Sequence, residues 1–244
     1  MKIQCVFVII FVKGVDKMKV TVKFLSHSGY LVETDKHILV FDYIKGDLPK
    51  FNKPCLFIAT HSHKDHFSKD ILNIRGDVRF LLSSDIKEDE KLVFQDNVYY
   101  IGPNAKRIVG DIQISTFGST DKGISVFAFV DNVGIFHAGD LNLWIWDEDS
   151  EEERLEMTRA FREEVKKVQL KNVDLAMFPL DPRLGAYASS GIDYFIDLIR
   201  PRYIFPMHMW DDFSIAKAYS EDFSSPFTNF VPVERDNQVF DLDL

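Results

Sequence analysis

The spacing of apolar residues divides the chain into a strand-rich first half and a second half that alternates helices with strands. Alternating or continuous apolar runs are typical of strands when turn residues bound them. The predicted strands cover residues 19–26, 29–34, 37–43, 56–60, 78–83, 97–101, 107–116 and 124–137. Asp35-Lys36 is expected to turn one hairpin, and the stretch from Val130 to Gly134 carries the turn signal of another. The first half is therefore expected to be mostly sheet.

The second half begins with an amphipathic helix. Ser150 and Glu153 form a capping box, and the apolar residues that follow at helical spacing predict a helix over 151–169. Further along, the pattern predicts a strand at 173–180, a helix around 190–200, a strand at 203–208, a helix near 213–223 and a strand-like tail at 239–243. No repeat, low-complexity tract or linker divides residues 18–244, which we interpret as one domain.

The first 17 residues differ from the rest. Lys2 precedes an apolar run over residues 5–12, which resembles the start of a signal peptide. The run is shorter than the roughly 20 residues that a membrane span needs, and no cleavage pattern follows it. Met18 begins the first predicted strand. We interpret residues 1–17 as an extension outside the core, with no stable membrane insertion; an export signal or membrane-associating segment is the alternative.

Composition narrows the function classes. The chain has 244 residues, is 46% hydrophobic and carries a formal charge of −9. This acidic balance gives no broad attraction to phosphate backbones, so nucleic acid is not an expected partner. Cys5 and Cys55 form neither a disulfide framework nor a CxxC metal clip, which favours a cytoplasmic location. Nothing in the composition predicts the oligomeric state.

A histidine cluster follows one of the apolar strands. Residues 61–66 read His-Ser-His-Lys-Asp-His, directly after the strand at 56–60. His61 and His63 point the same way in an extended segment, so one metal ion can bind both. Asp65 and His66 then turn away and can hold a second ion. A plain polar loop is the alternative, but three imidazoles and a carboxylate crowded together without a ligand would be costly.

Four other stretches lie in an order that resembles a known family. They are Leu-Val-Phe-Asp at 39–42, Phe-His-Ala-Gly-Asp at 136–140, Phe-Pro-Met-His at 205–208 and Phe-Leu-Ser-His-Ser at 24–28. Together with the motif at 61–66, they are similar to the metallo-β-lactamase fold superfamily. The histidine-serine turn is closest in pattern to the ascorbate-phosphate-lactonase-like branch of metal-dependent hydrolases. The resemblance implies an α/β fold, a four-layer αβ/βα sandwich of two mixed β-sheets flanked by helices, with the metals at one edge.

The resemblance also implies roles for single residues. Asp140 would bridge the two ions and His208 would be a further ligand, whereas a turn aspartate and a core histidine are the respective alternatives. Asp65 and His27 are the catalytic candidates. His27 and His137 could instead be structural, with His137 forming hydrogen bonds behind the ligands. The resemblance further implies that Asp42 braces the site.

The chain departs from the family pattern in one place. Members of the superfamily usually supply a third histidine to the first metal between the main motif and the Gly-Asp strand, but no histidine occurs between residues 67 and 136. Asp121, in the stretch Gly-Ser-Thr-Asp at 118–121, is the natural substitute because a carboxylate also binds zinc. A solvated turn aspartate before Gly123 is the alternative, and the first site would then be incomplete.

These ligands predict a metal-dependent hydrolase with two divalent ions, zinc first, with manganese or iron as alternatives. A hydroxide shared by the ions would attack a small, anionic ester, lactone or phosphodiester. An iron-loaded redox enzyme is the runner-up, and a non-catalytic metal- or ligand-binding sandwich is the alternative from another class. Trp144 and Trp146 could wall the pocket or pack the helix onto the sandwich, and Arg183 could bind an anionic group or pair with a surface carboxylate.

Overall fold

The computed structural model describes residues 18–92 and 95–244. The expectations for residues 1–17 lie outside the described residues, and the domain boundary at Met18 stays a prediction. Within the described ranges, no helix is both long and apolar enough to cross a membrane. The cytoplasmic location also stays a prediction.

The first sheet has the strand order β14-β1-β2-β3-β4-β5-β6 among the described residues. Its members are β1 (Lys19–Ser26), β2 (Gly29–Glu33), β3 (Ile38–Phe41), β4 (Cys55–Ala59), β5 (Val78–Ser83), β6 (Val98–Ile101) and β14 (Val239–Asp243). Strands β14, β1, β2 and β3 pair antiparallel, and β3 to β6 pair parallel. β4 is buried along its whole length, as expected for a parallel strand covered on both faces.

The second sheet has the order β13-β12-β11-β10-β9-β8-β7 in the described ranges. Its members are β7 (Lys106–Val109), β8 (Ile112–Phe117), β9 (Ser125–Val130), β10 (Val133–His137), β11 (Leu175–Pro179), β12 (Tyr203–Met207) and β13 (Asn229–Phe230). The prediction of one strand over 107–116 is wrong, because β7 and β8 form a hairpin there. Gly110, with a φ of +65°, supplies the left-handed conformation that its turn requires.

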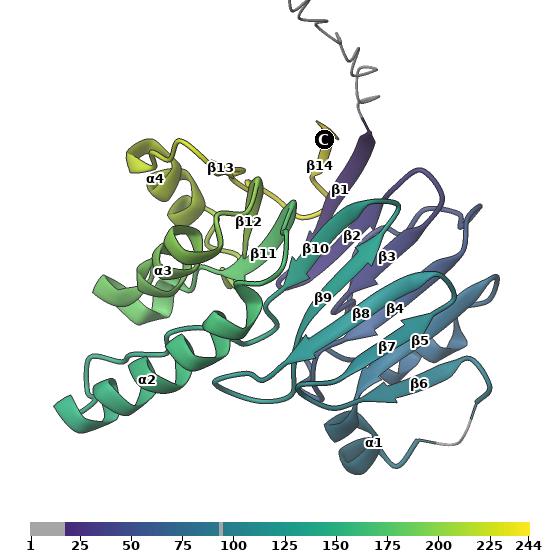
Figure 1. The fold of residues 1–244 in the computed structure, drawn as a ribbon, viewed down its shortest axis with the longest axis horizontal. Coiled ribbons are helices and arrows are strands. Elements are labelled where there is room, and N and C mark those ends of the chain that lie inside the picture. The colour runs from purple at the N-terminus through teal and green to yellow at the C-terminus, as the bar shows by residue number, and fades with distance from the viewer. Residues whose placement is uncertain (1–17, 93–94) are drawn as a thin grey trace, which may run out of the picture.

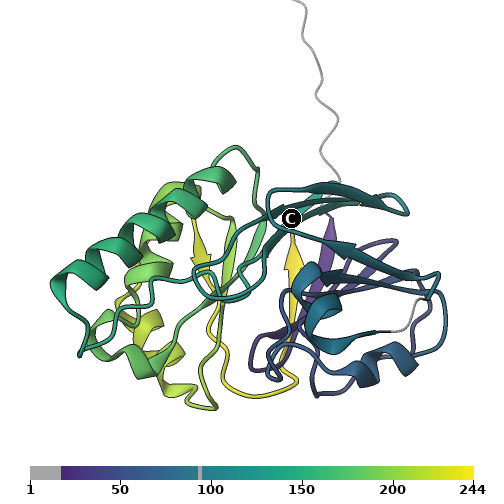
Figure 2. The same cartoon turned by 90° about the horizontal axis from the view of Figure 1, so that it is seen from below.

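The helices lie on the outer faces of the sheets (Figures 1 and 2). They are α1 (Ser84–Glu90), α2 (Glu151–Val168), α3 (Ser190–Ile199) and α4 (Ser214–Asp222), with short 3-10 helices η1 (Lys69–Asn73) and η2 (Pro182–Tyr187). The predicted capping box of α2 is present: Ser150 accepts a hydrogen bond from the backbone of Glu153, whose side chain accepts one from the backbone of Ser150. Helix α1 was not predicted, because Ile86 is its single buried residue.

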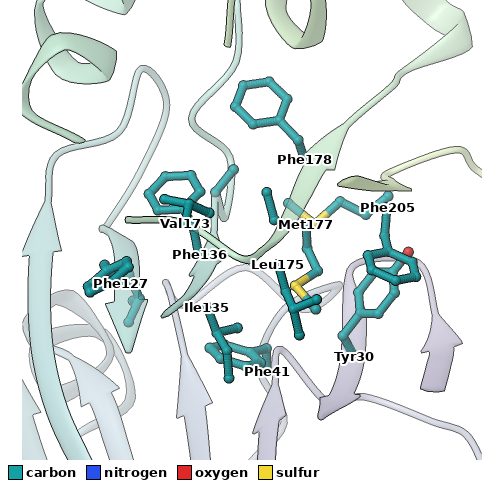
Figure 3. Close-up of a cluster of buried hydrophobic side chains, with 14 of the residues drawn as sticks. Tyr30, Phe41, Phe127, Ile135, Phe136, Val173, Leu175, Met177, Phe178 and Phe205 are labelled. Carbon is teal, nitrogen blue, oxygen red and sulfur yellow. The ribbon is translucent and has the colours of Figure 1, made fainter. Parts of the chain in front are cut away.

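The main core fills the space between the two sheets (Figure 3). Alternate residues of β1 enter it, whereas β10 and β11 are buried along their full lengths. The Tyr30 hydroxyl donates a 2.6 Å hydrogen bond to the backbone oxygen of Pro206, which ties β2 to β12 across the sandwich. A second cluster, including Phe57, Phe80 and Ile86, packs the outer face of the first sheet against η1 and α1. The predicted four-layer sandwich is confirmed.

Candidate metal centre

The polar residues of the centre follow the ends of parallel strands. Asp42 follows β3 and the histidine motif follows β4, while Asp140, Asp181 and His208 follow β10, β11 and β12. Within each sheet these strands run in parallel register, so their carboxyl ends share one edge. The backbone nitrogen of His208 donates a 3.0 Å hydrogen bond to the oxygen of His27, which joins the two edges.

Seven residues form two groups that could hold metal ions. The first group is His61, His63 and Asp140; the second is His27, Asp65, His66 and His208. Within each group, one ligand atom from each residue lies within 4.8 Å of all the others. The structure therefore brings together all the sequence-predicted site residues except Asp121.

Asp140 lies between the two groups. Its Oδ2 is 3.2 Å from Nε2 of His61, and its Oδ1 is 3.0 Å from Nε2 of His66 and 3.6 Å from Nε2 of His208. Despite this proximity, His61 Nε2, His66 Nε2 and Asp140 Oδ1 are buried and make no hydrogen bond of acceptable geometry among the described residues. Buried polar atoms left this way are costly unless they have another partner. Metal ions bound between these atoms would supply the missing partners.

The back of each imidazole is held by a hydrogen bond. Nδ1 of His66 donates to Asp42 at 2.7 Å. The Thr60 hydroxyl donates to Asp42 at 2.7 Å and lies 3.0 Å from Nδ1 of His61, so it accepts from that nitrogen. With Nδ1 held by an oxygen in both imidazoles, Nε2 faces Asp140 and is the nitrogen that could bind a metal, as in metal-binding histidines. Asp42 has the bracing role that the resemblance implied.

His208 has its own carboxylate, which the sequence did not reveal. Asp181 accepts a 2.8 Å hydrogen bond from Nδ1 of His208 and a 3.2 Å bond from the indole of Trp210, and it also accepts from Arg183. Asp181 is fully buried. Its position at the end of a predicted strand, like Asp140, was the only signal in the sequence that could have found it.

The carboxylates of the centre are ionised at neutral pH. Burial raises the pKa of Asp42 and of Asp140, but the surrounding histidines, His66 foremost, together outweigh that effect, and both pKa values are lower than usual. The pKa of Asp181 is likewise well below its usual range, because hydrogen bonds from His208 and Arg183 outweigh burial. Burial lowers the pKa of His27, so that imidazole is neutral. Burial lowers the pKa of His66, but Asp140 and Asp42 outweigh burial and raise the pKa of that imidazole. Buried carboxylates that stay ionised, and that attract positive charge in this way, suit cations.

Several backbone conformations at the centre are ones that side chains rarely adopt. His27, Asp42 and His208 have φ values of 52°, 42° and 64°. Gly123, with a φ of +74°, packs so closely that a Cβ there would lie 2.1 Å from the backbone oxygen of Thr60. Such strain concentrates at functional sites and persists only where the surrounding structure enforces it.

Two predicted neighbours of the centre have structural contacts. His137 lies 2.9 Å from the backbone oxygen of Ser28 through Nε2, its Nδ1 accepts from Gly139, and its ring stacks on Phe41. It braces the strand ends rather than joining either ligand group. The indole of Trp144 donates a 2.9 Å hydrogen bond to the backbone oxygen of Asp140, and its ring lies 5.4 Å from that of His208.

Asp121 lies at the rim of the centre. Its Oδ2 is 3.8 Å from Nδ1 of His63, and its side chain is half exposed. Both residues line a cavity of about 780 Å³ that opens in front of the centre. The same cavity is lined by Asp65, Asp140 and His208 and, on its other walls, by Trp144, Trp146, Met157, Arg183 and Trp210.

Comparison with known proteins identifies the family. The model of the beta-lactamase superfamily domain matches residues 21–208. The chain belongs to the beta-lactamase superfamily. It is 25% identical to a UPF0173 metal-dependent hydrolase of Nanoarchaeum equitans, over 83% of this chain and 89% of that protein. A Pyrococcus horikoshii UPF0173 metal-dependent hydrolase is 26% identical, over 78% and 84% of the two chains.

The fold has solved counterparts. The structure of Igni18, a metallo hydrolase from Ignicoccus hospitalis, superposes with a TM-score of 0.64 at 17% identity, covering 93% of this chain and 99% of that one. At this identity the likeness concerns the fold. Together, the matches confirm the expected superfamily and the expected enzyme class, a metal-dependent hydrolase.

Proposed function

We propose that the chain holds two divalent metal ions, zinc first, and uses them to hydrolyse a small ester, lactone or phosphodiester. The observation that carries this proposal is the pair of ligand groups around Asp140, whose two oxygens face different groups. Three ligands in one group match the number found in catalytic zinc sites, which keep one position open. Bound cations of this kind lower the pKa of water and polarise a carbonyl or phosphoryl oxygen.

The chain's own residues supply orientation and proton handling. Nε2 of His27 lies 3.3 Å from Oδ2 of Asp65, and this contact holds the pKa of Asp65 well below its usual range. Asp65 is therefore ionised and lines the cavity, where it can bind a metal or accept a hydrogen bond from water. We propose that His27 orients Asp65 and contributes a neutral imidazole to the same group.

Metal analysis followed by substrate assays tests this function. The purified protein is stripped with a chelator, reloaded with zinc, manganese or iron(II), and assayed on ester, lactone and phosphodiester substrates with one chromogenic leaving group. We expect metal-dependent hydrolysis of at least one class, lost in Asp140→Ala. Turnover of none, with two ions bound, would favour the non-catalytic alternative. Oxygen consumption only in the iron-loaded form would favour redox chemistry.

A further inference from the structure

Arg183 is distinctive among the residues that line the cavity. Among the described residues, it is the one arginine or lysine in that lining. The other charged side chains there, apart from histidines, are acidic: Asp65, Asp121, Asp140, Asp149, Glu153 and Glu156. A single cation in an otherwise acidic lining marks the place where a negatively charged substrate group is least disfavoured.

The guanidinium of Arg183 is fixed on one side. Nε donates to both oxygens of Asp181, at 3.0 and 3.1 Å, and Nη2 donates to Oδ2 at 2.6 Å. Within the described ranges, Nη1 donates no hydrogen bond, and the side chain is 43% exposed. One edge of the planar guanidinium is thus committed to Asp181, while the donors of Nη1 remain available.

Two indoles hold the guanidinium in place. Its central carbon lies 4.3 Å from the ring centroid of Trp210 and 5.6 Å from that of Trp146. These tryptophans come from different loops, one after β12 and one before α2. Stacking restricts the rotation of a long side chain before any ligand arrives, so less entropy is lost when a ligand binds. The arrangement presents a preoriented cation beside the metal centre.

We propose that Arg183 is a specificity-determining residue, which donates from Nη1 to an anionic oxygen of the substrate and selects anionic over neutral substrates. The proposal rests on the hydrolase function proposed above. Acidic residues of the α2 wall, Glu153 and Glu156, would repel the same group, so they favour binding on the Arg183 side. The anionic oxygen belongs either to a phosphodiester at the reacting bond or to a carboxylate elsewhere on the substrate.

Kinetics on three 4-nitrophenyl substrates test the proposal. Zinc-loaded wild type and Arg183→Gln are compared on bis(4-nitrophenyl) phosphate, on 4-nitrophenyl hemisuccinate and on 4-nitrophenyl butyrate, whose terminal methyl replaces the carboxylate of the hemisuccinate. Losing a charged hydrogen bond is expected to lower kcat/KM about 10–100-fold for an anionic substrate and to leave the butyrate within about twofold. Loss on the phosphodiester alone identifies a phosphoryl oxygen as the recognised group; loss on the hemisuccinate identifies a remote carboxylate.

Two outcomes overturn the proposal. Equal loss on all three substrates, accompanied by altered zinc content, would make Arg183 a positioning residue that acts through Asp181 and His208. No loss on either anionic substrate would leave it without a role in recognition. Arg183→Lys keeps a cation next to Asp181 but loses the planar, two-pronged donor geometry of the guanidinium, and we expect this variant to retain part of the preference for anionic substrates. If the glutamine variant does not fold, the lysine variant must still weaken that preference at least about threefold.

A binding measurement separates this proposal from the proposed function. Dimethyl phosphate and monomethyl succinate, which carries a remote carboxylate, are each titrated calorimetrically into the zinc-loaded proteins, and the Kd of at least one is expected to rise about tenfold or more in Arg183→Gln. If the wild type cleaves none of the three substrates, the proposed function fails, yet the titration still decides the role of Arg183. Arg107→Gln is the control. It removes another arginine that stacks on an aromatic ring, that of Tyr99, and neither residue lines the cavity. Unchanged Kd values for both ligands in Arg183→Gln would refute the proposal.

Discussion

Asp42 is the residue whose replacement should affect both metal ions at once. It accepts directly from His66, of one ligand group, and it reaches His61, of the other group, through Thr60. In Asp42→Asn the side chain keeps its volume, but the amide nitrogen cannot accept the hydrogen bonds that one carboxylate oxygen now receives. Losing such an outer partner typically weakens metal binding about 10–100-fold, or about 1.4–2.8 kcal/mol per ion.

Competition against a chromophoric chelator measures this effect. We expect both zinc-binding steps to weaken in Asp42→Asn, whereas Asp181→Asn should weaken mainly one, because Asp181 contacts His208 and neither His61 nor His66. Asp197→Asn is a matched control, since Asp197 is exposed on α3 and lies outside both groups. Wild-type affinity for both ions in Asp42→Asn, or weakening of one ion alone, would refute the proposed link between the groups.

Three other substitutions test separate parts of the structure. Asp131→Ala should lower the free energy of unfolding by about 1.5–3 kcal/mol at pH 7, whereas Asp111→Ala, at an exposed carboxylate on the same histidine, should cost at most about 1 kcal/mol. Burial raises the pKa of Asp131, but the hydrogen bonds it accepts together outweigh burial, and the pKa is lowered in the folded protein. The stability that Asp131 contributes is therefore present above the ordinary aspartate pKa and is lost as the pH falls through the lower pKa of the folded state. The measurement is denaturant unfolding at pH 7 and at pH 3. An equal loss of stability in Asp131→Ala at the two pH values would contradict this reasoning. Gly123→Ala should lower the free energy of unfolding by about 2–5 kcal/mol and weaken metal binding. Gly76→Ala, at a φ of +131° that also disfavours a side chain but leaves room for a Cβ, should cost less; equal losses in melting temperature would refute the close approach at Gly123. Asp121→Ala should weaken one ion if its rim carboxylate binds metal, and unchanged metal content would make it a turn residue.

Local signals predicted most of the elements. Alternation in β1, the continuous apolar run of β4 and the capping box of α2 each depend on neighbours in the sequence, and each is present. The hairpin of β7 and β8 was missed because apolar residues flank Gly110 closely on both sides. Helix α1 was missed because a single buried side chain leaves no periodicity to detect.

Some residues of the metal centre could likewise be predicted from local sequence, and others could not. Residues 61–66 are contiguous, so their spacing alone indicated shared ligands. Asp181 contacts His208 because β11 and β12 pair in parallel register, and that register brings together residues far apart in sequence. The position of Trp210 against Arg183 likewise depends on two loops from different strands. Sequence patterns predict strand ends, but the pairing of strands determines which side chains meet there.

Metal stoichiometry tests the central claim most directly. The protein is stripped, reloaded with excess zinc, dialysed and analysed for zinc per chain, with Asp140→Ala treated in parallel. Because Asp140 directs one oxygen toward each ligand group, we expect two zinc ions per wild-type chain and a reduced affinity at both positions in the variant. One ion per wild-type chain under metal excess, or two fully retained ions in Asp140→Ala, would contradict the account of a dinuclear centre built around this carboxylate.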